Sequence, residues 1–138
     1  MNWDDVIRAD IAALNADTAL RTLLGLDYAQ RIKRTADGTL LFPSVTYFVV
    51  TGSLDENTEA IEVQWDIWTR AIGAQSAYSA ALSIEARIRA VFHRTTVTTI
   101  GGIKLWTEVS DHRDHEDPES GVVHRSLDIV QEFARAVA

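Results

Sequence analysis

The hydrophobic positions at the start of the chain recur at steps of three and four residues. This spacing predicts an amphipathic helix from Asp4 to Ala16, with its inner stripe formed by Val6, Ile7, Asp10, Ile11 and Leu14. The following run NADTALRTLLG predicts a second, short helix. Asp17 is a suitable N-cap for it, and Gly25 can end it in a left-handed conformation. Leu20, Leu23 and Leu24 are expected to face the core.

Two β-like segments follow. YAQRIKR, residues 28–34, is interpreted as a short strand, and TADG, residues 35–38, as a turn. After Pro43 the run SVTYFVVT is apolar at both odd and even positions. Such a run is typical of a strand covered on both sides or of one at the centre of a sheet.

The clearest strand runs from Glu59 to Arg70. Its two faces alternate, with Ile61, Val63, Trp65 and Ile67 against Glu62, Gln64, Asp66 and Trp68. A polar loop, GSLDENT at 52–58, joins it to the preceding strand, so the pair is predicted to form an antiparallel hairpin.

The period becomes helical again from Ala74 to Phe92. The predicted stripe consists of Tyr78, Ala81, Leu82, Glu85, Ile88 and Phe92. TTVTTI and KLWTEVS then indicate two strands around the turn IGGI, and VVHRSLDIVQEF indicates a last strand. Helices are separated from runs of hairpins in this order. The predicted fold is therefore α+β: an antiparallel or mixed sheet with the N-terminal helices and one long central helix packed on it.

Composition limits the functions that are open to the chain. Its 138 residues suit a single domain, 1–138, and it has no cysteine for disulfides or thiolate metal sites. No secretory signal is evident, and no apolar run approaches the roughly 20 residues that span a bilayer. The formal net charge of −7 opposes tight binding to a nucleic-acid backbone.

The stretch SDHRDHEDPESG, residues 110–121, holds five carboxylates and two histidines. It fails the calcium-loop pattern, which needs oxygen ligands at alternate positions and a central glycine. A zinc or transition-metal site could draw on His112 and His115 with Asp111, Asp114 or Glu116. One short loop offers no rigid scaffold, so the favoured interpretation is a solvated hairpin tip that contacts another surface.

The remaining candidate residues are aromatic or isolated. Trp68 ends an otherwise polar strand face, and Trp106 lies between polar neighbours; each is covered within the chain or contacts another subunit. His93 and His124 are interpreted as packing or capping residues. No phosphate loop, dinucleotide fingerprint, HExxH or GxSxG occurs, so neither catalysis nor a cofactor is predicted.

The succession of segments resembles the tail terminator, or tail completion, proteins of long-tailed phages and gene-transfer particles. The resemblance covers nearly the whole chain and is carried by LRTLLG, PSVTYFVVTGS, IEVQWDIWTR, AYSAALSIEARIRAVF and HRSLDIVQEFARA, in that order. The chain departs from the family in having Ser-Val-Thr-Tyr after Pro43, where an aromatic residue is expected nearer the proline. Its 110–121 loop is also longer and more acidic.

The resemblance implies a structural virion protein, not an enzyme, at the head-proximal end of the tail and assembled in the host cytoplasm. Its expected partners are further copies of itself in a hexameric ring, the major tail tube protein and the head–tail connector or stopper, with DNA passing through the lumen without specific binding. The alternatives are a neck connector or stopper protein and a metal-dependent enzyme using residues 111–116. The candidate subunit or tube contacts are Trp68, Trp106, Asp111, His112, Asp114, His115, Glu116 and Asp117.

Overall fold

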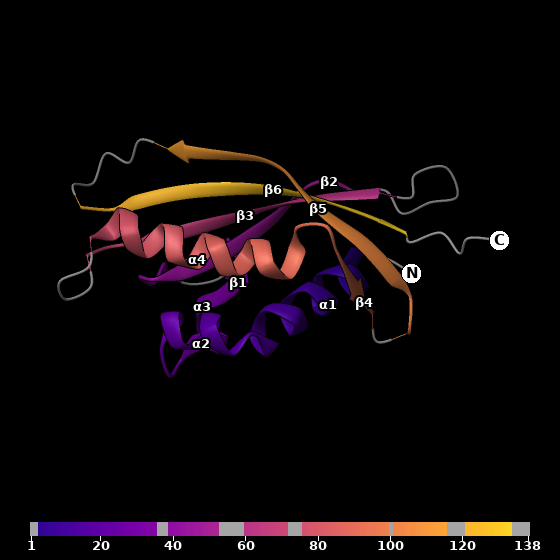
Figure 1. Ribbon diagram of the computed structural model, residues 1–138, viewed down its shortest axis with the longest axis horizontal. Coiled ribbons are helices and arrows are strands. Elements are labelled where there is room, and N and C mark those ends of the chain that lie inside the picture. The colour runs from indigo at the N-terminus through magenta and orange to yellow at the C-terminus, as the bar shows by residue number, and fades with distance from the viewer. Residues whose placement is uncertain are drawn as a thin grey trace.

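The computed structural model describes residues 3–35, 39–52, 60–71, 76–99, 101–115 and 121–133. Its helices are α1 (Trp3–Ala16), α2 (Thr18–Leu24), α3 (Tyr28–Arg31) and α4 (Ala77–Phe92). Its strands are β1 (Ile32–Arg34), β2 (Ser44–Gly52), β3 (Ala60–Thr69), β4 (Thr95–Thr98), β5 (Lys104–His115) and β6 (Val123–Phe133). All four helices lie on the same side of the strands (Figure 1).

The six strands form one mixed sheet in the order β1-β2-β3-β6-β5-β4. Every pair is antiparallel except β1 and β2, which are parallel. The α+β prediction, with N-terminal helices and a long central helix on the sheet, is confirmed. None of the helices in the described part of the chain is long and apolar enough to cross a membrane.

The N-terminal helices form as their sequence predicts. Asp17 caps α2, its Oδ1 accepting a hydrogen bond of 2.8 Å from the Leu20 amide. Gly25 ends α2 at a positive φ of 101°, although its ψ of −174° places it outside the left-handed helical region. Leu20 and Leu24 are buried, and Leu23 packs against the same core.

Residues 28–34 differ from the predicted strand. Tyr28–Arg31 form one helical turn, and only Ile32–Arg34 are extended. The Arg31 side chain reaches back one turn to Asp27, with Nε 2.7 Å from Oδ1, which is the i,i+4 spacing that a helix supplies. Residues 36–38 of the predicted turn lie outside the described residues.

The predicted hairpin of β2 and β3 is confirmed by their antiparallel ladder, while residues 53–59 of its loop lie outside the described residues. β2 has a strand on either side, but its sequence is not covered on both faces: Phe48 and Val50 are exposed. Val50 is the extra residue of a bulge between Val49 and Thr51. Two expected stripe members of α4, Tyr78 and Leu82, are likewise exposed.

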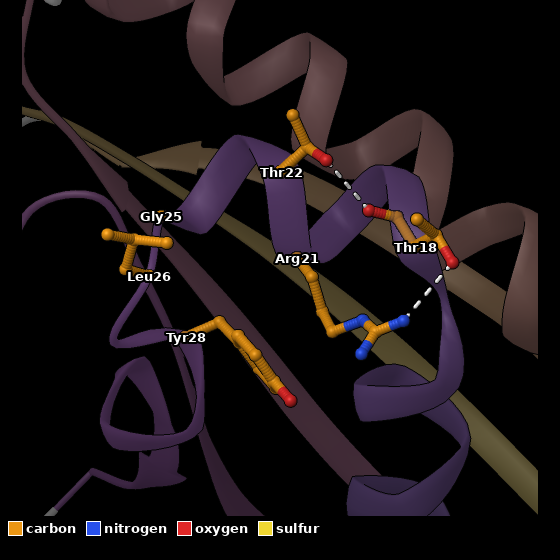
Figure 2. Close-up of a pocket in the computed structure, with 6 residues that line it drawn as sticks. All are labelled: Thr18, Arg21, Thr22, Gly25, Leu26 and Tyr28. Carbon is orange, nitrogen blue, oxygen red and sulfur yellow. Dashed lines mark hydrogen bonds between the residues drawn. The ribbon is translucent and has the colours of Figure 1, made fainter.

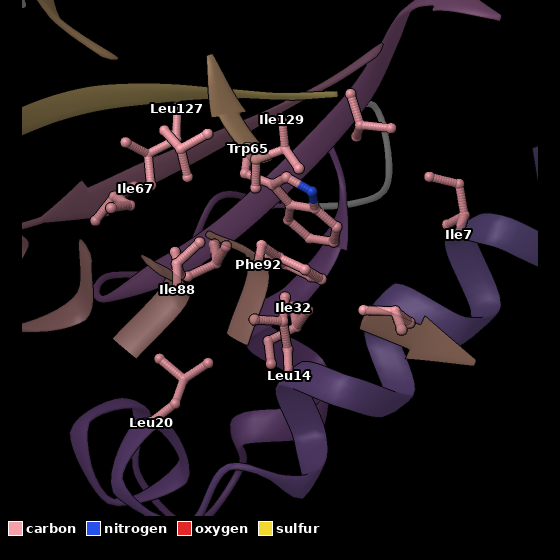
Figure 3. Close-up of a cluster of buried hydrophobic side chains, with 14 of the residues drawn as sticks. Ile7, Leu14, Leu20, Ile32, Trp65, Ile67, Ile88, Phe92, Leu127 and Ile129 are labelled. Atoms are coloured by element: carbon pink, nitrogen blue, oxygen red, sulfur yellow. The ribbon is translucent and has the colours of Figure 1, made fainter. Parts of the chain in front are cut away.

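The core lies between the helices and the sheet and is centred on Trp65 of β3 (Figure 3). The Trp65 side chain is fully buried, stacked on Phe92 of α4 with ring centroids 5.9 Å apart. The ring of Tyr47 on β2 also lies next to Trp65, with the two ring centroids 5.1 Å apart. Ile7 and Leu14 of α1 belong to the same cluster, so the N-terminal helices share one core with α4 and the sheet (Figure 3).

The last hairpin corrects the interpretation of residues 110–121. The chain does not leave the sheet at Ser110: β5 continues to His115, and each residue from Asp111 to His115 has a partner on β6. Residues 111–115 are therefore strand residues with fixed faces, and a loop can begin only after them. Glu116 and Asp117 lie outside the described residues.

Candidate functional site

The two faces of the sheet differ in what covers them. On β3, the apolar alternate residues lie on the helix side, whereas Glu62, Gln64, Asp66 and Trp68 lie on the other. No helix in the described part of the chain lies over this second side (Figure 1), which we call the open face. Polar side chains from neighbouring strands meet there and form the candidate site.

A bulge in β5 decides which residues reach the open face. Val109 pairs with Ile129, and Asp111 pairs with the next residue of β6, Asp128, so Ser110 is the extra residue. Beyond the bulge, Asp111, Arg113 and His115 share the open face, while His112 and Asp114 lie on the helix side. The run predicted as one cluster is thus divided between two faces.

The centre of the open face is a group that we call the histidine cluster: Asp66, His115, His124 and Ser126. The Ser126 hydroxyl donates to Asp66 Oδ1 at 2.5 Å and lies 2.6 Å from His115 Nε2. His124 Nε2 is 2.9 Å from the same Asp66 oxygen. Asp66 is 2% exposed and Ser126 is fully buried, so strands β3, β5 and β6 converge on an enclosed polar centre.

Aromatic stacking holds the ring of His124 in place. Trp68 of β3 stacks on His124 with centroids 3.6 Å apart, and His115 of β5 stacks on it at 4.2 Å. The Trp68 indole donates to Thr46 Oγ1 at 3.0 Å. Trp68 is therefore covered within the chain by residues of its own sheet face, and the ring of His124 packs between Trp68 and His115.

Arg113 joins the histidine cluster to a second carboxylate. Its guanidinium donates to both oxygens of Asp128, at 2.6 and 3.2 Å, and to Gln64 Oε1 at 2.9 Å. Gln64 in turn donates from its amide to Asp66 Oδ1 at 2.9 Å. A continuous chain of hydrogen bonds thus crosses three strands of the open face.

The environment shifts two pKa values within the histidine cluster. Burial acts to raise the pKa of Asp66, but hydrogen bonds from His124, Ser126 and Gln64 outweigh it and hold this pKa below the ordinary value. Burial, with the neighbouring His124, lowers the pKa of His115. The first shift favours the ionised form of Asp66, and the second favours the neutral form of His115.

The histidine cluster does not have the arrangement of a nucleophilic triad. In a triad the imidazole lies between the serine and the carboxylate, so that it can take the serine proton. Here the Ser126 hydroxyl itself donates to Asp66 and is enclosed, out of reach of a substrate. The donor types and their convergence instead suit coordination of a cation.

The helix-side residues of the same strand have different partners. His112 lies 3.2 Å from a guanidinium nitrogen of Arg89 on α4. Asp114 accepts a hydrogen bond of 2.7 Å from Arg125, which also binds Glu85 of α4. The alternative metal site of the sequence analysis, with His112 and His115 as joint ligands, cannot form around one ion, because these two side chains lie on opposite sides of the sheet.

The two remaining candidates from the sequence lie at the edge of the sheet and at the end of α4. Trp106 is 42% exposed on the open face of β5, beside edge strand β4. His93 is the C-cap residue of α4, and its Nδ1 accepts a hydrogen bond of 3.2 Å from the Val109 amide. The capping interpretation of His93 is thus confirmed.

A separate hollow of about 490 Å³ lies on the helix side, between α2 and α3 (Figure 2). The Arg21 guanidinium carbon lies 5.4 Å from the ring centre of Tyr28 across it, and Leu26 at its rim is fully exposed. The described residues that line it are Thr18, Arg21, Thr22, Gly25, Leu26 and Tyr28.

Sequence reasoning missed Asp66 and Ser126 as site residues. Asp66 was visible as a polar member of an alternating strand, and Ser126 as a small residue two positions after His124. Their meeting depends on the register of β3 against β6, in which Asp66 pairs with Ser126 and Trp68 with His124. Nothing local in the sequence specifies that register.

An α+β domain with one uncovered sheet face is the class of fold that these observations define. The same fold occurs in a chain of a solved structure described as "Virion of native gene transfer agent (GTA) particle". The two chains superpose with a TM-score of 0.63 over 91% of this chain and 92% of the other, at 16% sequence identity. No protein-family model matches the sequence, and neither does any curated protein.

Proposed function

We propose that this chain is a structural virion protein of a phage-like particle and that it acts as the tail terminator. The observation that carries the proposal is the fold shared, end to end, with a chain from a gene transfer agent virion. The order of segments in the sequence supports the same role. In this role the protein forms a ring, proposed to be hexameric, on the end of the tail tube and stops its growth.

The exposed features of the sheet suit assembly into a ring. Both edge strands, β1 and β4, carry a free ladder side in the described part of the chain, and such edges pair readily with another chain. Trp106 and Phe48 expose large aromatic surface on the open face, at 42% and 40%. Aromatic side chains of this kind are enriched where subunits dock. We propose Trp106 as a subunit or tube contact.

The polar residues of β5 are proposed to contribute to the same contacts. Asp111 is exposed on the open face, while His112 and Asp114 are exposed on the other side of the strand. Trp68 and His115 are also proposed contacts. His115 belongs to the histidine cluster on the open face, and Trp68 stacks on His124 of the same cluster. Glu116 and Asp117, which follow directly in the chain, remain proposed contacts with the tube or a neighbouring subunit.

The charge of the chain fits a ring around DNA. A net charge of −7 repels phosphate, so a lumen lined by this protein lets DNA slide without binding it. The expected partners are the major tail tube protein on one side and the head–tail connector or stopper on the other.

Electron microscopy of the purified protein, alone and mixed with its tube protein, tests the proposal. Closed rings that cap tube ends are expected, and native mass spectrometry gives their subunit number. A protein that stays monomeric and leaves tube length unchanged contradicts the terminator role. Rings that bind the portal side and not the tube would indicate the neck connector or stopper instead.

A further inference from the structure

We propose that Asp66, His115 and His124 form a binding site for one divalent transition-metal ion of the zinc class. One donor atom from each residue lies within 4.8 Å of the other two. Two imidazole nitrogens and a carboxylate oxygen are ligands that Zn²⁺ takes in proteins, with a fourth position left to solvent or another side chain. This inference stands on the histidine cluster alone and does not depend on the proposed virion role.

The three donors are supplied by three neighbouring strands, which gives the site a rigid frame. His115 of β5 and His124 of β6 are direct partners in one antiparallel ladder. Asp66 of β3 pairs with Ser126, two residues along β6 on the same face. Ladder hydrogen bonds therefore fix the separation of the three Cα atoms, as a preorganised metal site requires.

The rings are also held in orientation. His124 has Trp68 stacked against it from β3 and His115 from β5, with interplanar angles of 13° and 19°. The Nε2 atoms of both histidines are directed at the same small group of oxygens, Asp66 Oδ1 and Ser126 Oγ. Little side-chain freedom remains to be lost when an ion binds.

The Ser126 hydroxyl connects two of the three donor residues. Its hydroxyl bridges His115 Nε2 and Asp66 Oδ1, at 2.6 and 2.5 Å, and so lies between two of the donors. Metal–ligand bonds of about 2.0–2.1 Å require the donors to close around the ion. We infer that the ion replaces this hydroxyl bridge, with the serine oxygen or a water molecule completing the coordination.

The charge of the site favours a cation. Asp66 is an almost fully buried carboxylate, and one of its oxygens accepts hydrogen bonds from the Ser126 hydroxyl and the Gln64 amide and lies 2.9 Å from His124 Nε2. The two arginines on nearby strands are engaged elsewhere: Arg113 with Asp128 and Asp111, and Arg125 with Glu85 and Asp114. His124 and neutral hydrogen-bond donors surround Asp66. A divalent ion coordinated by the two imidazoles and by Asp66 would bring positive charge to this carboxylate.

The site's location indicates what the ion would do. His115 is the last residue of β5, and His124 is the second residue of β6, so both stand at the end of this hairpin. An ion shared with Asp66 would tie the hairpin end to β3. The consequence is a stiffer open face beside residues 116–120.

Titration of the full chain, first freed of metal with a chelator, with ZnCl₂ tests the site. Isothermal titration calorimetry is expected to show one equivalent bound, and the thermal midpoint is expected to rise with Zn²⁺ concentration. Loss of a second-sphere partner typically weakens metal sites by about 10–100-fold, so His115→Ala and His124→Ala are each expected to weaken binding by more than about 100-fold. Mg²⁺ is expected not to bind at this site.

His112→Ala is the matched control, because His112 lies on the same strand but on the helix side. It is expected to bind Zn²⁺ as the unaltered chain does. Asp66→Asn, nearly equal in shape, is expected to remain folded by circular dichroism and to lose binding, which separates coordination from folding. Absence of stoichiometric Zn²⁺ binding, or binding that survives His115→Ala but is lost in His112→Ala, overturns the proposal.

Discussion

Arg125 and Glu85 form a buried ion pair that joins the sheet to the long helix. Arg125 Nε of β6 lies 2.7 Å from Glu85 Oε1 of α4, and the two side chains are 9% and 11% exposed. Arg125 also holds Asp114 of β5 at 2.7 Å, so one guanidinium links three elements. These two carboxylates raise the pKa of Arg125, so the guanidinium keeps its positive charge.

Removing Arg125 is expected to destabilise the fold strongly. In Arg125→Met, Glu85 loses its close partner and keeps only the longer contact with Arg89, whose Nε lies 3.8 Å from Glu85 Oε2. Removing one partner of a buried ion pair costs about 3–5 kcal/mol of unfolding free energy, and the remaining contact with Arg89 leads us to expect the lower end of this range. Urea denaturation measures the loss. The exposed pair of Arg94 and Glu108 is the control, since its side chains are 70% and 46% exposed. Arg94→Ala is expected to cost less than about 1 kcal/mol, and equal losses for the two variants would contradict this distinction.

Asp10 is expected to make the protein less stable as the pH rises. Burial raises the pKa of its carboxyl well above the ordinary value, although Gln131 donates to it at 2.6 Å. The folded state therefore binds a proton more tightly than the unfolded state. The contribution of Asp10 to stability is therefore greatest below the unfolded pKa of about 3.9 and is lost as the pH rises towards the raised folded value.

Asp10→Asn tests this expectation directly. The Asp10 Oδ2 and Gln131 Oε1 atoms have no hydrogen-bond partner among the described residues, and an asparagine amide can donate where the ionised carboxylate cannot. The variant is expected to be more stable at pH 7 by about 1–3 kcal/mol, the cost of an unsatisfied buried group. Urea unfolding at several pH values should show the difference shrinking towards pH 4. A variant less stable than the original at pH 7 would refute the argument.

Asp17 combines two roles that substitutions can separate. It caps α2, and its carboxylate binds the Arg87 guanidinium of α4 through two hydrogen bonds of 3.1 and 2.6 Å. Asp17→Ala removes both and is expected to cost about 1–2 kcal/mol, the usual value of an N-cap with a small addition from the ion pair. Asp17→Asn keeps the cap and is expected to cost less than half as much.

The pH dependence of these two variants supplies a second check. Arg87 lowers the pKa of Asp17, so the ion pair stabilises the fold above the unfolded pKa of about 3.9 and is lost as the pH falls through the folded value. The stability gap between Asp17→Asn and the original chain should therefore close in acid. A gap that stays constant down to pH 2 would assign the effect to packing.

Trp106 is expected to matter for assembly and not for folding. Because its side chain is 42% exposed, Trp106→Ala should change the unfolding free energy by about 0.5 kcal/mol or less. If Trp106 is a subunit or tube contact, the same variant should reduce ring formation in sedimentation velocity measurements. Tyr78 of α4, 47% exposed on the helix side, provides the control as Tyr78→Ala. Equal assembly defects in both variants would argue against a specific contact at Trp106.

Periodicity predicted most of the fold because each long element carries its own signal. The alternation of β3 and the helical spacing of α1 and α4 appear in the structure nearly where the sequence places them. The strand prediction for residues 28–34 was partly wrong because the segment is short. Over so few residues, one helical turn and one short strand have nearly the same hydrophobic pattern. The prediction that Tyr78 and Leu82 belong to the buried stripe of α4 was wrong, because both side chains are exposed.

The site was harder to predict because strand residues on an open sheet face are polar, so the alternation of apolar and polar residues that identifies a strand is missing. A strand whose residues are polar on both sides, as Asp111 to His115 are, cannot be told from a loop by hydrophobic pattern alone. His115 was recognised as a candidate ligand, but its partners Asp66 and His124 come from strands far away in sequence. Only the ladder registers bring them together.

Because of the bulge at Ser110, β5 can lose one residue at this position without a change in which side chains face the helices. The ladder between Val109 and Asp111 carries one residue more than its partner strand, so removing Ser110 would leave every later side chain on its present face. Removing His112 would instead turn Arg113 and His115 towards the helices and Asp114 outwards. A one-residue deletion is thus neutral to the geometry of the open face at one position and inverts it two positions later.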